Sequence, residues 1–236
     1  MKKNEPEIVL LKGTLRSVTV VDTELDLIFT PADRNAAAAT GVAAAAMGLS
    51  GLAAGAVDSS VADAKLPMKQ VRFELEGQLV EALLWGFPFR DGDMVEAVVE
   101  PDASGYRAYA VACPKSRIIA VYPYSTSGLV AHILSSARIF FYFCLFFILP
   151  FCILIHYISV HDGISTPLSV GVGAAVIFGI VGANMSRKFL PFVRIAERIF
   201  TTLGFKDVRR INLRRLTKKL RRPDDPPALG DTYFRY

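Results

Sequence analysis

The first 130 residues alternate between apolar and polar positions, which is the pattern of β-strands that bury one face. The clearest run is Gly13–Val21, which is rich in β-branched side chains, and residues 71–85 repeat the alternation on either side of a turn at Glu76–Gly77. Further strands of this kind are predicted at 94–100, 106–114 and 117–124. Short strands separated by turns at this spacing predict a small β-barrel or sandwich, OB-like or SH3-like, for residues 1–130.

Two long apolar stretches follow this β-rich part. Residues 139–160 and 164–186 contain no Asp, Glu, Lys or Arg. The first stretch has 22 residues and would be about 33 Å long as a helix, enough to cross a hydrocarbon layer of about 30 Å. Pro150 is expected to kink it. Because only a short turn around His161 separates the two stretches, residues 137–188 are predicted to form a transmembrane helical hairpin. The chain as a whole is predicted to be an α+β membrane protein.

Small residues recur every four positions in the second stretch, so they share one face of a helix. They are Gly171, Ala175, Gly179 and Ala183. Small side chains at such positions let two helices approach closely in lipid. This face is predicted either to pack against the first stretch within one chain or to join a second copy in a homo-oligomer.

An uncharged segment rich in Ala and Gly interrupts the β pattern at residues 36–57. Three interpretations stay open: a helix or helical hairpin that lies against the barrel or the membrane surface, a flexible insertion, or a segment that enters the membrane. A single permanent crossing is not expected, because it would place the strands before and after the segment on opposite sides of the membrane, where they could not share a sheet.

Charge is distributed unevenly along the chain. Residues 1–136 have 12 Lys or Arg and 16 Asp or Glu, whereas residues 187–222 have 13 Lys or Arg and only two acidic residues. Basic residues beside an apolar span mark its cytoplasmic end. The chain is therefore predicted to lie in the bacterial inner (plasma) membrane as a multi-pass protein with both termini in the cytoplasm.

The basic segment directly follows an apolar span, so anionic lipid is the expected partner rather than nucleic acid. The residues predicted to face lipid headgroups are Arg187, Lys188, Arg194, Arg198, Arg209, Arg210, Arg214 and Arg215. Apolar side chains recur between them at helical spacing over residues 189–222, which predicts an amphipathic helix on the membrane surface. The rest of the C-terminal segment, 189–236, is expected to be a loose tail after Pro223–Pro227.

No motif for a known chemistry is present in the sequence. It contains no P-loop, no GxGxxG after a strand, no HExxH and no GxSxG, and its Cys and His residues do not have the spacing of a zinc site. His132 lies near Ser125, Ser127 and Ser135, but no acidic residue accompanies it to orient the imidazole. The sequence therefore predicts a non-enzymatic protein with no cofactor and no metal.

The stretch from Trp85 to His132 carries a family likeness. It contains Trp-Gly-Phe-Pro-Phe-Arg-Asp-Gly-Asp-Met-Val, then Arg-Ile-Ile-Ala-Val-Tyr-Pro-Tyr, and it precedes the pair of apolar stretches. In these features the chain resembles the type VI secretion system effector family of small two-span bacterial membrane proteins. It departs from that pattern at residues 113–119, where Cys-Pro-Lys-Ser-Arg-Ile-Ile replaces the family's Arg-Pro-x-x-Arg-Ile-Ile. The resemblance covers most of the chain, but its motifs are structural.

The resemblance implies a role in the type VI secretion setting, either as an effector that perturbs membranes or as the associated immunity or accessory factor. The partners expected on that basis are the lipid bilayer and a secretion-system, cognate toxin or immunity protein. The alternative is a membrane-anchored scaffold whose OB-like domain binds another protein. Both interpretations predict a membrane protein without enzymatic activity.

Overall fold

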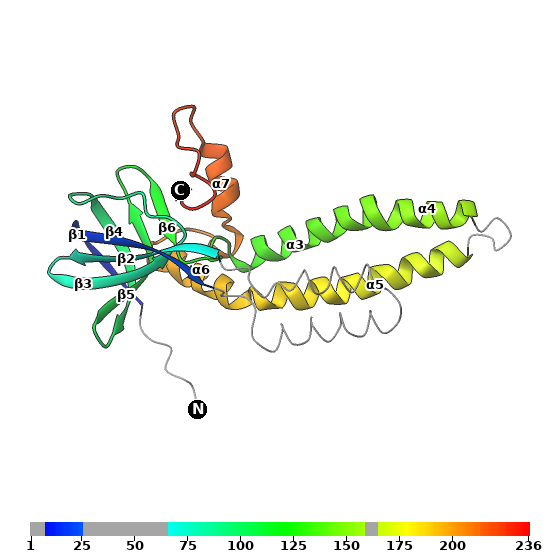
Figure 1. Cartoon of the computed structure of the whole chain (residues 1–236), viewed down its shortest axis with the longest axis horizontal. Helices are drawn as coiled ribbons and strands as arrows, with labels where there is room; N and C mark the ends of the chain where they lie inside the picture. The colour runs from blue at the N-terminus through cyan, green and yellow to red at the C-terminus, as the bar shows by residue number, and fades with distance from the viewer. Residues whose placement is uncertain (1–7, 26–65, 159–164) are drawn as a thin grey trace.

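The computed structural model describes residues 8–25, 66–158 and 165–236. A β-barrel forms one end of the molecule, and a long hairpin of two helices leads away from it (Figure 1). The Ala/Gly-rich segment 36–57 and the turn around His161 lie outside the described residues. Two of the helices are long and apolar enough to cross a membrane.

The barrel consists of five strands that close on themselves. Their order around the barrel is β1-β2-β3-β5-β4 and back to β1, with a parallel contact between β3 and β5 and antiparallel contacts elsewhere. Two further strands, β6 and β7, extend the sheet beyond β5. The strands are β1 (Val9–Leu25), β2 (Leu66–Leu75), β3 (Gln78–Leu84), β4 (Met94–Asp102), β5 (Gly105–Cys113), β6 (Ile118–Val121) and β7 (Phe234–Arg235). The prediction of a small β-barrel is confirmed.

Strand β1 is long because it serves two sides of the barrel. Its first part, residues 9–14, pairs with β4, and the part from Leu15 onward pairs with β2. A bulge between Arg16 and Thr19 bends the strand between these parts, and Ser17 in the bulge has a φ of 53°. At the end of β1, Leu25 pairs with Leu66 of β2, so the two strands that flank the Ala/Gly-rich segment lie side by side.

The interior of the barrel is filled by the alternating side chains that the sequence pattern singled out. The side chains of Val71, Phe73, Leu75, Val80, Val95, Ala97 and Val111 are among those that are fully or almost fully buried in it. A loop from the C-terminal part of the chain closes this core, because Leu229 and Tyr233 are buried against it. The barrel core is thus complete only when the end of the chain has returned to it.

The hairpin runs through three helical segments on the way out and one on the way back. These segments are α3 (Leu129–Phe143), η2 (Cys144–Ile148), α4 (Leu149–Ile158) and α5 (Ser165–Lys188). The outward helix begins ten residues before the predicted span, so its first turns belong to the joint with the barrel. After the hairpin come α6 (Leu190–Thr202), the short 3₁₀ helix η3 (Val208–Arg210) and α7 (Leu213–Leu220).

The segment η2 is a π-helical turn that lies directly before Pro150. The backbone N–H of Leu149 donates to the carbonyl of Cys144, one residue further back than in an α-helix. Proline lacks the N–H that would continue the α-helical ladder, and its ring crowds the preceding turn. The wider π turn accommodates both effects within the continuous helix Leu129–Ile158, and π turns and prolines are the usual sites of helix kinks.

The apolar face of the predicted amphipathic C-terminal helix is buried in protein, so its predicted contact with lipid is wrong. Helix α6 lays Phe192, Val193, Ala196, Ile199 and Phe200 inward, and the last three of these side chains are fully buried. They cover the outer face of the sheet, where Val98, Ala110, Ala112, Ile119 and Val121 are buried as well. An amphipathic pattern shows that one face is covered but not what covers it.

The expected loose tail is also wrong. Strand β7 pairs with β6 and Phe234 is fully buried. The backbone N–H of Arg235 donates to the hydroxyl of Thr217 in α7 at 2.9 Å, and the Arg235 guanidinium pairs with Asp225. Residues 189–236, which the sequence analysis separated from the barrel, therefore complete the same folded unit.

Candidate functional site

The two helices of the hairpin expose most of their apolar side chains. The stretches Leu129–Ile158 and Thr166–Lys188 both pass the length and hydropathy required of a membrane span. In the most apolar part of the first helix no residue is buried, and in that of the second helix 6% of the residues are buried. Phe146 and Phe147 are each 66% exposed, whereas Phe73 and Phe200 in the barrel unit are almost completely buried. The hairpin therefore has the composition of a core but the exposure of a surface.

The length of the hairpin matches the thickness of a hydrocarbon layer. Residues 139–158 are the uncharged part of the outward helix, and at about 1.5 Å per residue they extend about 30 Å. Arg138 precedes them, and Arg187 and Lys188 end the returning helix. The charged positions thus lie at the end of the hairpin that joins the barrel.

Two of the four predicted helix-packing residues face the outward helix of the same chain. A Cβ atom on Gly171 would lie 2.5 Å from the Sγ atom of Cys152, and one on Gly179 would lie 3.5 Å from Cζ of Phe140. Ala175, between them, is half-buried, and Ala183 is exposed. These small residues thus support close packing of the two hairpin helices in the half of the hairpin farther from the barrel and in its middle.

A small residue of α5 points away from its partner helix. A Cβ atom on Gly173 would meet nothing within 4 Å among the described residues. At about 100° per residue, Gly173 lies roughly 160° around the helix from Gly171, on the outward side of the hairpin. Gly171 and Gly173 therefore allow packing within the hairpin to be tested separately from packing between copies.

A polar cluster joins the two hairpin helices near the barrel. The Nε2 atom of His132 lies 2.9 Å from the Oγ atom of Ser186, and the hydroxyl of Ser136 lies 3.3 Å from the same atom. The serines near His132 in sequence, Ser125 and Ser127, are not among its hydrogen-bond partners. Because no carboxylate contacts the imidazole in the described part of the chain, the cluster links helices and has no orienting acid for a nucleophile.

The start of α3 is held by the barrel unit at two points. The backbone N–H of Leu129 donates to the Glu197 carboxylate of α6 at 2.9 Å, which places a negative charge at the positive end of the helix. The preceding residue, Gly128, lies against the backbone of η3, and a Cβ atom there would stand 2.2 Å from the carbonyl oxygen of Val208. The hairpin is thus attached to the barrel through α6 and η3 as well as through the chain itself.

Aromatic rings fill the joint between barrel and hairpin. Trp85 at the end of β3 contacts Tyr124 edge-on at 5.0 Å between ring centroids, and Tyr124 contacts Phe189 at 5.5 Å and Phe192 at 5.4 Å. Tyr122 stacks on Phe192 at 6.3 Å. Tyr and Trp favour the interface between water and hydrocarbon. A cluster of this composition suits the level at which the hairpin would enter a membrane.

The predicted lipid-facing basic residues gather around this joint. Arg187 and Lys188 end α5, Arg194 and Arg198 lie on α6, Arg209 and Arg210 on η3, and Arg214 and Arg215 begin α7. The segment after η3 touches the chain just before α3, because the N–H of Gly128 donates to the carbonyl of Ile211 at 3.0 Å. The Arg214 guanidinium lies 5.5 Å from the centre of the Trp85 ring. The contact between Gly128 and Ile211 thus places η3 and the start of α7 at the end of the barrel where α3 begins.

One titratable group on the barrel has a strongly shifted pKa. Burial, together with a hydrogen bond from its hydroxyl to Glu100 at 2.8 Å, raises the pKa of Tyr109 to about 12. Burial also raises the pKa of Tyr122, its neighbour in the aromatic contacts. Both phenols are therefore neutral hydrogen-bonding groups at physiological pH, and neither is poised to exchange a proton.

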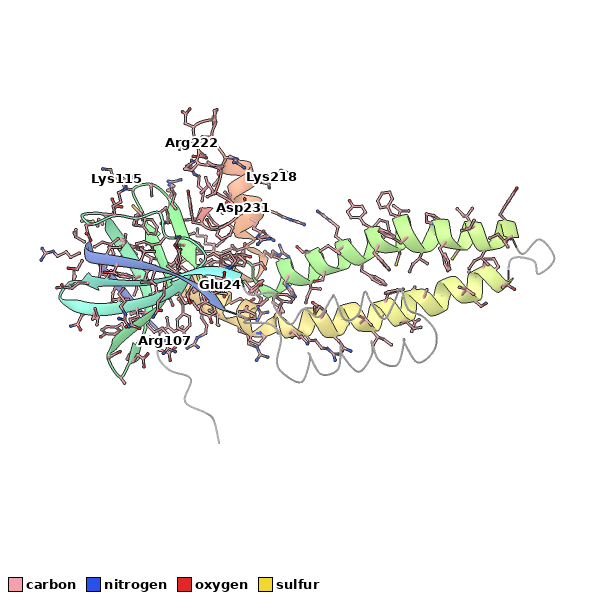
Figure 2. All side chains as sticks on the ribbon, in the orientation of Figure 1. Glu24, Arg107, Lys115, Lys218, Arg222 and Asp231 are labelled. Atoms are coloured by element: carbon pink, nitrogen blue, oxygen red, sulfur yellow. The ribbon has the colours of Figure 1, made fainter. Side chains whose placement is uncertain are left out.

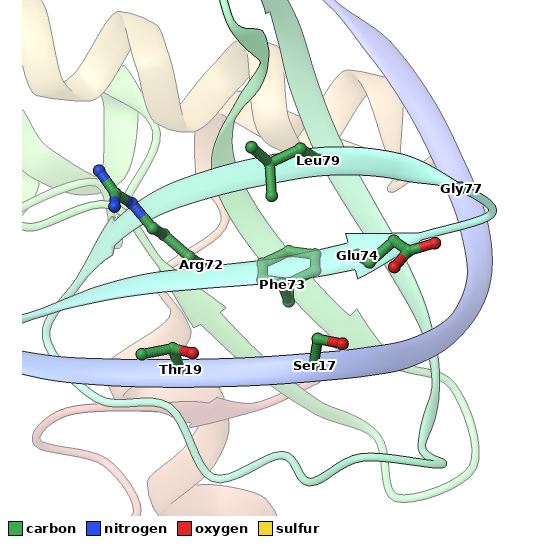
Figure 3. Close-up of a pocket in the computed structure, with 7 residues that line it drawn as sticks. All are labelled: Ser17, Thr19, Arg72, Phe73, Glu74, Gly77 and Leu79. Atoms are coloured by element: carbon green, nitrogen blue, oxygen red, sulfur yellow. The ribbon is translucent and has the colours of Figure 1, made fainter.

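A hollow lies over strands β1, β2 and β3 beside the turn at Gly77 (Figure 3). It is lined by Ser17, Thr19, Arg72, Phe73, Glu74, Gly77 and Leu79. Arg72 forms an ion pair with Glu81 at 2.7 Å, which satisfies its charge. Across residues 8–25, 66–158 and 165–236, no group of three or more His, Cys, Asp or Glu side chains converges in a way that could hold a metal ion. The hollow has a mixed polar and apolar lining and no identifiable chemistry.

The fold and the site define a closed β-barrel that carries an exposed apolar hairpin with basic and aromatic residues at its base. Comparisons of the chain with protein-family models, with curated proteins and with solved structures found no match. The geometry of the hairpin and of its attachment to the barrel is therefore the basis on which a function is inferred.

Proposed function

We propose that this protein is a non-enzymatic, membrane-anchored module. In this proposal the hairpin crosses the bacterial inner membrane, and the barrel is a binding domain for another protein on the cytoplasmic side. The observation that carries the proposal is the exposure of the hairpin. Isolated soluble proteins rarely expose contiguous apolar patches of more than a few hundred Å², whereas both hairpin helices are apolar over about 20 residues and exposed along that length.

The barrel topology favours a binding role for the domain outside the membrane. The order β1-β2-β3-β5-β4 with parallel β3 and β5 is that of OB-like rather than SH3-like barrels. OB-like barrels bind ligands on their outer surface and turns, while their interior is filled by side chains, as it is here. This is an analogy of fold, so it supports the class of activity and not a particular partner.

The position of the charges favours a cytoplasmic barrel. Arg187, Lys188 and the basic residues of α6, η3 and α7 lie at the barrel end of the hairpin. Basic residues close to a span are retained on the cytoplasmic side during insertion. Since β1 and β7 belong to the same folded unit, both termini would lie on that side.

Single-cysteine labelling tests this topology. We expect Asp162→Cys to react with a membrane-impermeant maleimide from the periplasmic side, and Lys115→Cys to react only after the inner membrane is permeabilised. A background with Cys113, Cys144 and Cys152 replaced removes the native thiols. Labelling of Lys115→Cys in intact spheroplasts, or release of the protein from membranes by carbonate, would overturn the proposal.

The second candidate function is that of an effector, or its immunity factor, in the type VI secretion setting. The sequence resemblance over Trp85–His132 favours it. In the structure this stretch forms β4, β5, β6 and the joint with α3, so its motifs support the barrel and the attachment of the hairpin. A membrane-perturbing effector would further require copies to assemble through the outside of the hairpin.

Two matched variants separate these functions. Gly173→Leu adds a side chain on the outward side of α5, whereas Gly171→Leu adds one where the two helices of one chain meet. For an effector, induced expression of the wild type depolarises cells and the outward variant does not, although it still inserts. For an anchored module, neither wild type nor outward variant depolarises cells. Protection of cells from a co-expressed neighbouring toxin would instead indicate immunity.

A further inference from the structure

The last helix, α7, presents a face of unpaired positive charge. Positions 213 and 217 are buried against the barrel, and at about 100° per residue positions 214, 215, 218 and 219 fall on the opposite side. Arg214, Arg215, Lys218 and Lys219 are exposed there, and Arg221 and Arg222 continue the series directly after the helix. Within the described part of the chain, none of these six side chains forms an ion pair with a carboxylate.

Two acidic residues, Asp224 and Asp225, follow the basic series. Asp225 accepts from the Arg235 guanidinium and from the backbone N–H of Arg222, so its charge is committed to the fold, and Asp224 is exposed beside it. Arg214 contacts the ring of Trp85, an interaction that leaves its charge uncompensated. Six cations within nine residues therefore remain available to an anionic partner.

The joint places this helix at the end of the barrel from which the hairpin leaves. Its N-cap residue Asn212 forms a β-bridge with Ser127, and the N–H of Leu213 donates to the carbonyl of Thr126 at 2.9 Å, three residues before α3 begins. Figure 1 shows α7 running across the direction of the hairpin, and in Figure 2 Lys218 lies on the side of α7 toward the hairpin. Lys115 lies on a more distant part of the barrel (Figure 2).

The distance to a bilayer surface is short enough for these charges to act. The ten residues from Leu129 to Arg138 extend about 15 Å, and the headgroup layer occupies roughly the first 5–8 Å outside the hydrocarbon. The gap left at the start of α7 is about one Debye length, and long Lys and Arg side chains reach across much of it. The charged face is thus within range of lipid phosphates.

We propose that α7 and residues 221–222 form a platform that recruits anionic phospholipid to the cytoplasmic leaflet beside the hairpin. This inference depends on the proposed membrane insertion and adds the lipid class that the barrel selects. Unlike an interfacial amphipathic helix, α7 has its apolar side on the barrel, so it attracts lipid by charge without inserting. Arg215, Lys218, Lys219, Arg221 and Arg222 are the residues that would contact headgroups.

The single tryptophan of the chain provides the probe, because Trp85 lies under Arg214. The full-length protein is incorporated into nanodiscs of phosphatidylcholine that contain a lipid with a spin label on its headgroup. Quenching of Trp85 then reports labelled lipid near α7. Unlabelled phosphatidylglycerol or phosphatidylcholine is added as a competitor, and their ratio of effectiveness is the selectivity.

We expect phosphatidylglycerol to relieve quenching more effectively, and high salt to abolish the difference. Each basic residue near an anionic surface is worth about 1 kcal/mol, or roughly fivefold. Lys218→Ala with Lys219→Ala should therefore lower the selectivity by up to about 25-fold. Lys115→Ala is the control and should leave it unchanged. All the substituted side chains are exposed, so the barrel should keep its fold.

Equal relief of Trp85 quenching by the two lipids would overturn the inference. Equal losses of lipid selectivity in the Lys115 variant and the Lys218/Lys219 variant would overturn it as well. Saturation of the Trp85 response by a single-stranded oligonucleotide, without any preference for phosphatidylglycerol, would assign the platform to nucleic acid and overturn it too. Failure of the protein to enter nanodiscs would instead refute the proposed function. The two failures are therefore distinguishable.

Discussion

The replacement of Phe200 by alanine tests whether α6 belongs to the barrel. Phe200 is fully buried between the helix and the sheet, and its ring stacks on Phe205 at 5.8 Å between centroids. Removal of a buried phenyl group eliminates its transfer free energy and leaves a cavity, which together cost about 3–5 kcal/mol. The free energy of unfolding of the barrel unit should fall by that amount.

Urea unfolding in a mild detergent measures the effect, with Trp85 fluorescence as the probe. For an m-value near 2 kcal/mol/M, a loss of about 4 kcal/mol moves the midpoint by roughly 2 M. Phe146→Ala is the matched control, because this side chain is 66% exposed on the hairpin and lies in detergent. Phe200→Leu should recover part of the loss.

The reasoning would be refuted if both alanine variants shifted the midpoint by a similar small amount. That result would mean that Phe200 lies against lipid or detergent, as the amphipathic pattern alone predicted. A large shift for Phe200→Ala with an unchanged midpoint for Phe146→Ala would establish α6 as part of the barrel core.

Three further predictions concern single positions. Asp225→Ala should destabilise the protein by about 3–5 kcal/mol, because it leaves the mostly buried Arg235 guanidinium without its partner, whereas the exposed neighbour Asp224→Ala should change the urea midpoint little. Gly128→Ala should cost about 3 kcal/mol, because its Cβ would stand 2.2 Å from the Val208 carbonyl, and the loss should appear as faster proteolysis at the joint. The phenol of Tyr109 should ionise near pH 12 rather than 10, so its contribution to stability is present below pH 10 and is lost as the pH rises through 12. A phenolate absorbance titration of the wild type measures this ionisation. The Tyr109→Phe variant is the control, because it lacks the ionisation step near pH 12.

The local features of the fold could be predicted from the sequence. The turn at Glu76–Gly77 has positive φ values of 51° and 79°, of which only the second suits its residue type, and Gly92 has a φ of 92° at the turn before β4. The apolar and β-branched runs at 94–100 and 106–114 correspond to strands β4 and β5. The hairpin followed from two uncharged stretches of sufficient length. Each of these features depends on residues that are close together in sequence.

The non-local features could not be predicted. The apolar face of α6 has the same spacing whether it meets lipid or a sheet, and the basic residues between Phe192 and Phe200 favoured lipid. The surface that α6 covers is formed by sheet residues such as Val98 and Ile119, which lie far earlier in the chain. Strand β7 has two residues and no periodicity of its own. Likewise, Ser186 as the partner of His132 becomes evident only when the helices pair.

The return of residues 190–236 to the barrel has a consequence for biosynthesis. Strands β1 to β6 leave the ribosome before the hairpin, whereas α6, α7 and β7 leave it afterwards, so the outer face of the sheet stays bare until both spans have been made. With the hairpin inserted as proposed, a chain that crossed the membrane only once would leave α6 on the opposite side from the barrel. The outer face of the sheet would then stay uncovered. Completion of the barrel thus verifies correct insertion, and nascent chains with the wrong topology would keep the exposed apolar surface that quality-control proteases recognise.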